Sequence, residues 1–580
     1  MSDEPRDGLH LVHDQDGAPP RTDEDAAAAI SAETHADSRY IDIGPTAPKP
    51  ILAQRQEIRI STDIKPAVDD AEEAILKMPR RNLYQRSGML VRVVRDNSPT
   101  IKGHKRPPGS IIIKQAGASY MRELFSRAAS WWALMAKDVP KWNKMSGHDQ
   151  ENNWRDVWTK KLPPTWTVEC LMDRGQWRFP PLTGIIAAPT MRPDGSILSR
   201  PGYDAATGLL YLPGDTLFPP VPDMPTQNDA RNALDRLVEP FWDFPFANRS
   251  DRSAALSAVL ALVCRAAILG PVPLFAVRAH LAGTGKTLIA DIVSLIGTGR
   301  IAPKWSQSQT EDEERKRLMA IAIEGDPVLL IDNVTKALGS GSLDMALTSG
   351  TIKDRVLGVT GTAEAPFRPV VFATGNNLQV KGDTARRVIP VDIDANCERP
   401  ELRSDWKYPD VKKWVLENRA SLVVDALTAC RAYAAAGWPR VDMPEMGSFE
   451  DFSKVARAVI VWAGLPDPVE GRERVRRESD PELELLRTVM TTWHGYFDDR
   501  AVTLKEVAEE LEDAYGDPAK AMKSALEDAT AGYSRGTFST KLGYYMRKYR
   551  GRILEGLRLD SGEKVAGGIP WAVLPLDSVK

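Results

Sequence analysis

The chain has 580 residues, of which 42% are hydrophobic and 27% are charged, and its formal net charge is -3. This composition is ordinary for a soluble globular protein with several hydrophobic cores. The near-neutral balance excludes a global attraction for nucleic acid, so any such site must be a local patch. The four cysteines are far apart and show no C-x-x-C spacing, which argues against a zinc site or a disulfide framework and favours a reduced, cytoplasmic protein. No apolar stretch is long enough to span a bilayer, and the acidic N-terminal residues lack the pattern of a signal peptide.

The first part of the chain divides into a polar tail and a predicted domain. Residues 1–55 are rich in Asp, Ala, Pro and Thr and nearly lack aromatic side chains, so we expect them to be disordered. Residues 56–225 are expected to form an accessory α+β domain. Its predicted elements are a strand at 58–60, a helix at 67–78, a hairpin at 84–94 that turns at Ser87 and Gly88, and short strands at 197–198 and 209–212.

A glycine-rich turn follows a short apolar strand at 274–277 and precedes a helix with apolar periodicity at 288–296. In such a turn the glycines let backbone N–H groups point at an anion, and the helix N-terminus adds partial positive charge. Lys286 would reach the terminal phosphates of ATP, and the Thr287 hydroxyl would bind Mg²⁺. The sequence therefore predicts a phosphate-binding loop formed by Gly283, Thr284, Gly285, Lys286 and Thr287.

The loop departs from the pattern G-x-x-x-x-G-K-[ST] at its first position, where this chain has His280. A residue with a Cβ atom fits there if the turn does not need a positive φ. We therefore expect nucleotide binding to be retained, while the rate of hydrolysis is in doubt.

A second nucleotide-site element is the apolar run at 328–331, which ends in Asp332. Such a run is typical of a buried parallel strand that delivers a carboxylate at its C-terminal edge, so Asp332 is predicted to hold the Mg²⁺ water shell. The next residue is Asn333, where most ATPases of this type have a glutamate as base for the attacking water. Asparagine orients water but accepts no proton. Either another carboxylate, such as Glu324 or Asp326, is the base, or hydrolysis is slow.

A further apolar strand at 370–377 ends in two amides. We assign Asn376 to sensing the γ-phosphate and the attacking water, because an amide can hydrogen-bond both without adding charge. Arg386 and Arg387 precede the last strand, at 388–393. Paired arginines in this place suit an arginine finger that enters the site of a neighbouring subunit. The alternative is a solvated turn with two surface arginines.

Between the Asp332 strand and the Asn376 strand lies a predicted hairpin with its tip at 359–365. A hairpin in this position would point into the pore of a ring, where Lys353 and Arg355 would meet DNA phosphates. On charge alone, an ordinary solvated loop accounts for the same residues equally well.

Four elements thus stand in order: the Gly-Thr-Gly-Lys-Thr loop, the strand ending in aspartate, the basic hairpin, and the strand ending in amides with its following arginine pair. In this order they resemble superfamily 3 helicases of the phage and plasmid primase-helicase type, a branch of the AAA+ ATPases. The resemblance is specific over about 274–394 and looser over 170–213 and 447–468. It implies a hexameric ring on DNA that hydrolyses ATP between subunits. It matches Lys286 to the phosphate-binding lysine, Thr287 and Asp332 to the Mg²⁺ residues, Asn376 to the sensor, and Arg386 or Arg387 to the finger.

Some proteins of this type carry a primase-polymerase module at the N-terminus. Its chemistry needs clustered carboxylates on adjacent strands to hold two metal ions. Residues 57–177 contain no convincing D-x-D or D-x-E pair with a partner. We therefore expect an accessory domain without a priming site.

The C-terminal residues favour a winged-helix-like domain. Thr503 and Glu506 have the spacing of a capping box, so a helix is expected to begin there, and two more helices and a two-stranded ribbon follow. Basic residues on the third helix form the local patch that DNA phosphates would need. The alternative is a protein-binding domain with a solvated basic face. The candidate DNA contacts are Lys541, Arg547 and Lys548, with Arg550 and Arg552 beside them.

The predicted fold class is α/β: an AAA+-like P-loop ATPase core with an α+β N-terminal domain and a C-terminal winged-helix-like domain. These features favour an ATP-dependent DNA helicase or translocase that acts in replication of a mobile element. Its partners would be single-stranded DNA in the pore, duplex DNA at the winged helix and further copies of the chain. Two alternatives stay open: a non-translocating AAA+ initiator or loader, and a primase-polymerase with an attached helicase. The expected boundaries are 56–225 for the accessory domain, 226–440 for the ATPase domain, 441–500 for a helical connector and 501–580 for the C-terminal domain.

Overall fold

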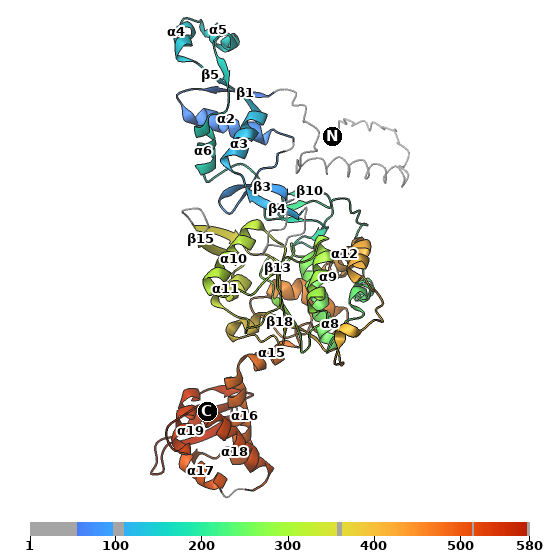
Figure 1. The fold of residues 1–580 in the computed structure, drawn as a ribbon, viewed down its shortest axis with the longest axis vertical. Helices are drawn as coiled ribbons and strands as arrows, with labels where there is room; N and C mark the ends of the chain where they lie inside the picture. Colours follow the sequence, from blue (N-terminus) through green and yellow to red (C-terminus); the bar gives the residue numbers. More distant parts are fainter. Residues whose placement is uncertain (1–54, 80, 97–109, 356–361, 513–514, 577–580) are drawn as a thin grey trace, which may run out of the picture. The chain divides into compact units, whose positions relative to one another are not determined.

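The computed structural model describes residues 55–79, 81–96, 110–355, 362–512 and 515–576 (Figure 1). Residues 1–54, for which the composition predicts disorder, lie outside these ranges. The described chain separates into two compact units: unit 1 comprises residues 55–96, 110–189 and 198–217, and unit 2 comprises residues 190–197 and 218–576. Among the described residues, no helix has the length and apolar character that crossing a lipid bilayer requires.

Unit 1 is built on a three-stranded sheet with one face covered by helices. The central strand β5 (Ala129–Ala133) pairs parallel with β1 (Gln56–Ile60) and antiparallel with β6 (Thr159–Lys161). Ile58 and Trp131 are fully buried on the covered face. The covering helices are α2 (Ile64–Leu76), α3 (Ala118–Ala128) and α6 (Thr165–Asp173).

The local elements predicted near the start of unit 1 are present. The predicted helix is α2, which begins three residues earlier than expected because the Asp63 side chain caps its N-terminus. The predicted hairpin consists of β2 (Tyr84–Arg86) and β3 (Met89–Asp96). Its turn residues Ser87 and Gly88 have positive φ values of 53° and 71°, the backbone that a two-residue hairpin turn requires.

Two further features complete unit 1. β4 (Ser110–Gln115) extends the hairpin into a three-stranded antiparallel sheet. The predicted strand at 209–212 is part of a second small sheet, with the order β10 (Gly202–Asp204), β11 (Leu209–Tyr211), β7 (Gly184–Ile186). Between β5 and β6 the chain forms a small lobe of four short helices, labelled α4 and α5 in Figure 1: η2 (Ala136–Asp138), α4 (Val139–Asn143), α5 (Gly147–Asn152) and η3 (Trp154–Asp156).

The core of unit 2 is a parallel sheet of five strands. Their order is β13 (Lys304–Trp305), β14 (Val328–Ile331), β17 (Val370–Asn376), β12 (Leu274–Ala279) and β18 (Val388–Ile393). Four of the strands, β12, β14, β17 and β18, are mainly apolar and buried, as expected where helices cover both faces, whereas the short edge strand β13 is polar and partly exposed. The first strand in sequence, β12, lies between two later ones. This order makes a switch point beside β12, where an α/β sheet opens a crevice at its carboxyl edge.

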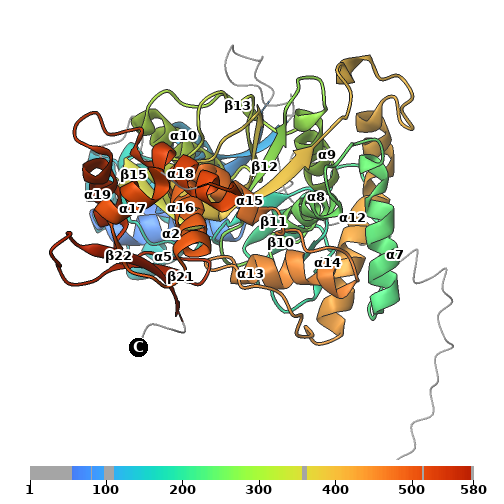
Figure 2. The same cartoon turned by 90° about the horizontal axis from the view of Figure 1, so that it is seen from below.

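Helices cover both faces of the five-stranded sheet (Figures 1 and 2). Helix α8 (Arg249–Val263) begins at Arg249 because Asn248 and Asp251 form a capping box. Phe275 and Phe372 stack within the sheet, with ring centroids 5.5 Å apart. One face carries α8 (Arg249–Val263), α9 (Lys286–Thr298) and α12 (Val411–Ala435), with α7 (Gln227–Leu237) packed on α12, and the other carries α10 (Glu311–Glu324) and α11 (Gly341–Ser349).

Shorter elements join these layers. The predicted hairpin is the antiparallel pair β15 (Thr351–Arg355) and β16 (Thr362–Pro366). Its connecting residues 356–361, which include part of the predicted tip, lie outside the described residues. The other elements are β8 (Thr190–Met191), β9 (Ile197–Leu198), η4 (Glu239–Phe241), η5 (Gly382–Arg387), η6 (Pro400–Leu402), α13 (Glu450–Phe452), the π-helical turn η7 (Ser453–Arg457), α14 (Ala458–Trp462) and α15 (Arg472–Ser479).

The C-terminal part of unit 2 has its own hydrophobic core. The predicted capping box is present: the Thr503 N–H donates to the Glu506 carboxylate at 2.7 Å, and the Glu506 N–H donates to the Thr503 hydroxyl at 3.3 Å. Trp493 of α16 (Pro481–Phe497) lies in the same core as Trp571, so α16 belongs here rather than to a connector that ends at residue 500. The helices are α16, α17 (Leu504–Glu512), α18 (Asp517–Thr530) and α19 (Phe538–Tyr549), visible in Figure 2, and the antiparallel sheet has the order β19 (Val502–Thr503), β22 (Pro570–Pro575), β21 (Leu557–Ser561), β20 (Ile553–Leu554).

Candidate nucleotide-binding site

The predicted phosphate-binding loop joins the end of β12 to the start of α9. Gly283 and Gly285 have positive φ values of 75° and 85°. A Cβ atom on Gly285 would lie 2.9 Å from a ring carbon of Phe244, so side chains are excluded there by both backbone and neighbour. His280 adopts no positive φ, and its Nδ1 lies 2.9 Å from Oδ1 of Asn377. The departure from the usual motif is therefore accommodated without backbone strain.

Lys286 is the first residue of α9, and its side chain folds back over the loop. Its Nζ donates to the carbonyl oxygen of Leu281 at 2.8 Å and to the Thr284 hydroxyl at 3.1 Å. Burial lowers the pKa of the Lys286 ammonium. Among the described residues no carboxylate lies within ion-pair distance of it. The loop thus offers a half-buried cation without a counter-ion, at a helix N-terminus, to an incoming anion.

Asp332 follows β14 and lies beside the loop. Its Oδ1 accepts hydrogen bonds from the hydroxyls of Thr287 at 2.8 Å and Thr374 at 2.7 Å. The Lys304 Nζ lies 3.6 Å from its Oδ2. Burial acts to raise the pKa of Asp332, but the hydroxyls of Thr374 and Thr287 and the Lys304 charge together hold it below its ordinary value. Asp332 is therefore an ionised carboxylate in contact with the loop hydroxyl.

Thr374 and Lys304 were not among the predicted site residues. Strand pairing places both residues beside Asp332. Ile331 pairs with Ala373, so the next residues, Asp332 and Thr374, are neighbours at the carboxyl edge, and Lys304 pairs with Leu330 on the other side. The signal available in the sequence was a lone threonine in an apolar strand. Thr374 is fully buried, and a buried hydroxyl needs a partner.

Asn376 is the last residue of β17, and it pairs with Ala279 at the start of the loop. It is exposed to solvent at this edge. The following residue, Asn377, has a positive φ of 47° and donates its N–H to the Ala279 carbonyl at 3.0 Å. The structure therefore brings Lys286, Asp332 and Asn376 to the same carboxyl edge of the sheet.

Asn333 occupies the position expected for a catalytic glutamate. It is exposed, has a positive φ of 54°, and donates its backbone N–H to the Thr374 hydroxyl at 3.1 Å. The suggestion that Glu324 or Asp326 supplies the missing base is wrong. Both precede β14, whereas Asp332 follows it, and a four-residue strand separates its ends by about 13 Å.

The two candidate finger arginines, both in η5, differ in their contacts. Arg387 is mostly buried and pairs with Asp344 at 2.9 Å and with Asp383 at 2.7 Å. The Arg386 side chain is 71% exposed, and its Nε lies 3.7 Å from Asp383. Arg387 is held within its own chain, and Arg386 projects outward.

The candidate DNA contacts of the hairpin are less complete. Lys353 is exposed on β15, directly opposite Glu364 of β16, so its charge is offset across the strand pair. The side chain of Arg355 lies outside the described residues, as does the part of the tip before residue 362. The structure therefore supplies the hairpin but leaves the phosphate contacts as predictions.

On α19 the three candidate basic residues are in different environments. Arg547 is exposed, with its guanidinium 5.0 Å from the ring centroid of the exposed Tyr544. Lys541 is half-buried. Lys548 pairs with Glu482 of α16 at 2.6 Å, and this hydrogen bond raises its pKa. Lys548 is thus committed to its own domain, and Arg547 is the best placed for an external phosphate.

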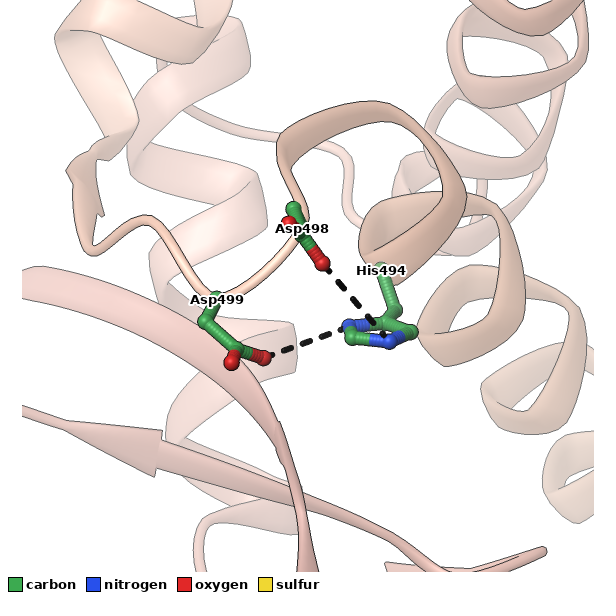
Figure 3. A group of neighbouring side chains, drawn as sticks. All are labelled: His494, Asp498 and Asp499. Atoms are coloured by element: carbon green, nitrogen blue, oxygen red, sulfur yellow. Dashed lines mark ion pairs between the residues drawn. The ribbon is translucent and has the colours of Figure 1, made fainter. Parts of the chain in front are cut away.

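One cluster outside the nucleotide site has the composition of a metal site: His494, Asp498 and Asp499 (Figure 3). The two carboxylates approach opposite ring nitrogens, Asp498 at 4.0 Å from Nε2 and Asp499 at 3.7 Å from Nδ1. One ligand atom from each residue lies within 4.8 Å of the others, but both carboxylates are exposed, and exposed acidic groups of this kind are common without a bound ion. It is the only cluster of this kind in the described parts of the chain, and it lies in unit 2.

No protein-family profile and no curated protein matches the sequence. Solved structures with some similarity include the A form of the apo NrS-1 C-terminal region, at 12% identity and a TM-score of 0.38, covering 84% of this chain and 96% of that chain. A second structure of that region matches at 13% identity and a TM-score of 0.35, and the match covers 63% of this chain and 79% of that chain. JCV helicase matches at 13% identity and a TM-score of 0.19, and the match covers 45% of this chain and 71% of that chain. Because these TM-scores are below 0.5, the site is interpreted from its own geometry.

Proposed function

We propose that this chain is an ATP-dependent DNA helicase or translocase of the superfamily 3 type, with an AAA+-like core, which assembles into a ring and acts in replication of a phage, plasmid or integrated element. The observation that carries the proposal is the meeting of Lys286, Asp332 and Asn376 at one edge of a parallel sheet. A phosphate-binding loop, an acidic strand end and an amide strand end are the parts that nucleoside triphosphate hydrolysis needs at one place.

The residues at this edge fit ATP and Mg²⁺. Among the described residues Lys286 has no carboxylate partner, and it would balance the charge of the terminal phosphates. The Thr287 hydroxyl and the ionised Asp332, 2.8 Å apart, are hard oxygen donors of the kind that Mg²⁺ prefers. Mg²⁺, when bound, neutralises phosphate oxygens. The exposed amide of Asn376 would orient the attacking water.

A site completed by a neighbouring subunit explains the two arginines. Arg387 is engaged by Asp344 and Asp383, whereas Arg386 projects into solvent. We assign Arg386 as the finger that stabilises the transition state in the next subunit, and Arg387 as the residue that positions η5. A homo-oligomeric ring, a hexamer in proteins of this type, gives every site such a neighbour.

DNA would contact two places in unit 2. The β15–β16 hairpin carries Lys353 and Arg355 and is the candidate pore element for single-stranded DNA. The C-terminal helices and sheet are winged-helix-like, and Arg547 on α19 is the leading candidate for a duplex phosphate contact.

The test uses the full chain with ATP, Mg²⁺ and single-stranded DNA. We expect DNA-stimulated ATP hydrolysis, separation of a forked duplex, and rings with DNA threaded through them in electron micrographs. Arg386→Ala should reduce stimulated turnover by about 10³-fold. Mixing Arg386→Ala with Lys286→Ala subunits should restore part of the turnover, because mixed interfaces then include complete sites.

Arg387→Ala is the matched control, and it should lower the melting temperature as well as the activity, since it removes two ion pairs. If mixed rings of the two variants stay inactive while each still binds ATP, Arg386 does not act in a neighbouring site.

A second candidate function is a non-translocating AAA+ switch, an initiator or loader whose ATP state controls assembly. Asn333 favours it, because the amide accepts no proton and the structure places Glu324 and Asp326 at the other end of β14. Nucleotide-dependent ring formation with negligible turnover and no strand separation would select this function over the helicase.

A further inference from the structure

The β1–β5–β6 sheet of unit 1 has a second face that α2, α3 and α6 do not cover. Residues paired across neighbouring strands share one face of a sheet, and successive residues alternate between faces. Ile58 pairs with Trp131, and both are buried under the helices. The next residues, Arg59, Trp132 and Lys160, therefore form a row across all three strands on the opposite face, which we call the outer face.

The outer face is continuous with a cluster of tryptophans from the small lobe. Trp132 meets Trp154 edge-to-face, with centroids 5.2 Å apart. Trp158 lies 6.4 Å from Trp154 and 5.6 Å from Trp142, again edge-to-face. Trp132, Trp142 and Trp158 are half-buried, so part of each ring is open to solvent. These four tryptophans lie outside the hydrophobic core that contains Trp131, as far as the structure describes it.

The aromatic cluster is not completed by its own chain. The indole N–H groups of Trp132 and Trp158 have no acceptor in the described part of the protein. Buried indole N–H groups normally find an acceptor. Both nitrogens are themselves buried, so the fold leaves polar atoms unpaired inside this cluster.

Basic side chains lie beside these rings and outnumber the acidic ones, although Arg155 is paired with Glu57. The Arg59 guanidinium lies 5.5 Å from the centroid of Trp154 and 6.0 Å from that of Trp158. Every residue of β6 is exposed, including Lys160 and Lys161. Residues 137–161 contain six Lys or Arg against four Asp or Glu, in a chain whose net charge is -3. One acid in this segment, Asp149, accepts hydrogen bonds from Ser146 and Asn153.

We propose that the outer face and its tryptophan cluster bind single-stranded nucleic acid. Unpaired bases stack on partly open indole rings, and exposed lysines at the margin contact the phosphates. Duplex DNA is disfavoured because its bases are already stacked and paired. An acidic protein would use the lysines but has no need of the open rings. The proposal stands apart from ATP hydrolysis, since none of its residues lies in unit 2.

The first test measures binding of a fluorescein-labelled oligo-dT of about twenty nucleotides to the full chain, without nucleotide, by anisotropy over a range of salt. Lys160→Glu should weaken binding about five- to tenfold and lower the salt slope by about one. The control is Lys114→Glu, an equal charge change at an exposed position on another strand of unit 1, β4. Equal affinities for the two variants would overturn the proposal.

The second test locates the contact independently of overall affinity. Oligonucleotides that contain 5-bromodeoxyuridine are cross-linked to the full chain by light, and the modified peptides are identified by mass spectrometry. We expect adducts on Trp132, Trp142 or Trp158, with lower yield in Lys160→Glu. Oligo-U of the same length should compete, whereas blunt duplex should not. Adducts found exclusively outside residues 130–161 overturn the proposal, as does competition by polyglutamate alone, which would indicate an acidic protein partner.

The Lys286→Ala variant separates this proposal from the proposed ATPase. It should form the same adducts on the tryptophan cluster as the unmodified chain. Adducts that persist without any ATP hydrolysis in the unmodified protein would refute the ATPase and leave the outer face standing. ATP hydrolysis without these adducts would support the ATPase and overturn the proposal for the outer face.

Discussion

The five-stranded sheet of unit 2 and the three-stranded sheet of unit 1 expose different parts of themselves. Helices bury both faces of the first, and Lys286, Asp332 and Asn376 gather at its carboxyl edge. The second is buried on one face, and its polar and aromatic residues spread across the other. A sheet that is covered on both faces thus presents a compact active site at its edge, whereas a sheet with an uncovered face presents a surface for an extended ligand.

The largest expected effect concerns the stability of the two sheets and compares one arginine from each. Arg278 of β12 is 9% exposed, donates to Asp392 of β18 at 2.7 and 2.9 Å, and contacts Glu478 of α15. Arg278→Ala should cost about 3 kcal/mol of unfolding free energy, because the mostly buried Asp392 loses a two-point partner and keeps only the partly exposed Arg474. Arg59→Ala, on the exposed outer face, should cost about 0.5–1 kcal/mol, the value of an exposed cation–π contact.

Denaturant unfolding of the full chain, followed separately for each transition, measures both variants. Asp392→Asn is the companion variant, since it leaves Arg278 partly unpaired from the other side. A cost for Arg59→Ala as large as that for Arg278→Ala would mean that the outer face is part of the stabilising core and not a free surface.

The next prediction tests whether the carboxyl edge of the unit 2 sheet is the site of ATP hydrolysis. Lys286→Ala should reduce ATP turnover about 10²–10³-fold, since one preorganised charge is lost where charge develops in the transition state. Lys316→Ala is the control, because Lys316 lies exposed on α10 and pairs with Asp312 of the same helix. Turnover is measured by phosphate release at saturating ATP. A variant that keeps more than about a tenth of the activity would place the site elsewhere.

The positions that sequence patterns identified are those whose partners are close along the chain. The glycines, Lys286 and Thr287 form a contiguous motif, and Asp332 and Asn376 each end an apolar strand. Their meeting follows from the general rule that parallel strands end at one edge. The hairpin that turns at Ser87 and Gly88 could be predicted in the same way, because two adjacent residues determine the turn.

What the sequence did not reveal depends on the order and register of strands. Thr374 reaches Asp332, and Lys304 approaches it, because β17 and β13 flank β14, which no local pattern states. The outer-face row joins Arg59, Trp132 and Lys160, which are separated by long stretches of sequence. Only the pairing of β1, β5 and β6 shows that they are neighbours.

A smaller effect separates backbone strain from crowding at the nucleotide edge. Gly285 and Gly175 both have positive φ, 85° and 73°, but a Cβ atom at Gly285 meets Phe244 at 2.9 Å and one at Gly175 meets nothing within 4 Å. Gly285→Ala should weaken ATP binding about tenfold or more, whereas Gly175→Ala should cost only about 1–2 kcal/mol of stability in unit 1. Calorimetric titration with a non-hydrolysable ATP analogue checks this.

The double variant Phe244→Ala and Gly285→Ala refines the result. Removing the ring relieves the contact but leaves the unfavourable φ, so affinity should recover in part. Full recovery would show that Phe244 alone sets the loop shape, and no change in affinity for Gly285→Ala itself would mean that the loop does not hold the phosphates.

The smallest effect concerns protons at the edge. Burial lowers the pKa of Lys286 below its ordinary value of about 10.5, so in the free protein the ammonium begins to lose its proton below that pH. A triphosphate beside it favours the charged form and raises the pKa again. Binding just below pH 10.5 should therefore take up a fraction of a proton, and affinity should fall as pH rises through this window.

Calorimetric titrations of the ATP analogue in buffers with different ionisation enthalpies measure that uptake directly. In Lys286→Arg the guanidinium stays charged at these pH values, so the part of the uptake due to position 286 should disappear even if affinity is reduced. Uptake that is the same in both proteins would assign the proton to another group. The phosphates would then not bind against Lys286. The carboxyl edge of the unit 2 sheet would no longer be distinguished from the outer face of unit 1 as a site for chemistry.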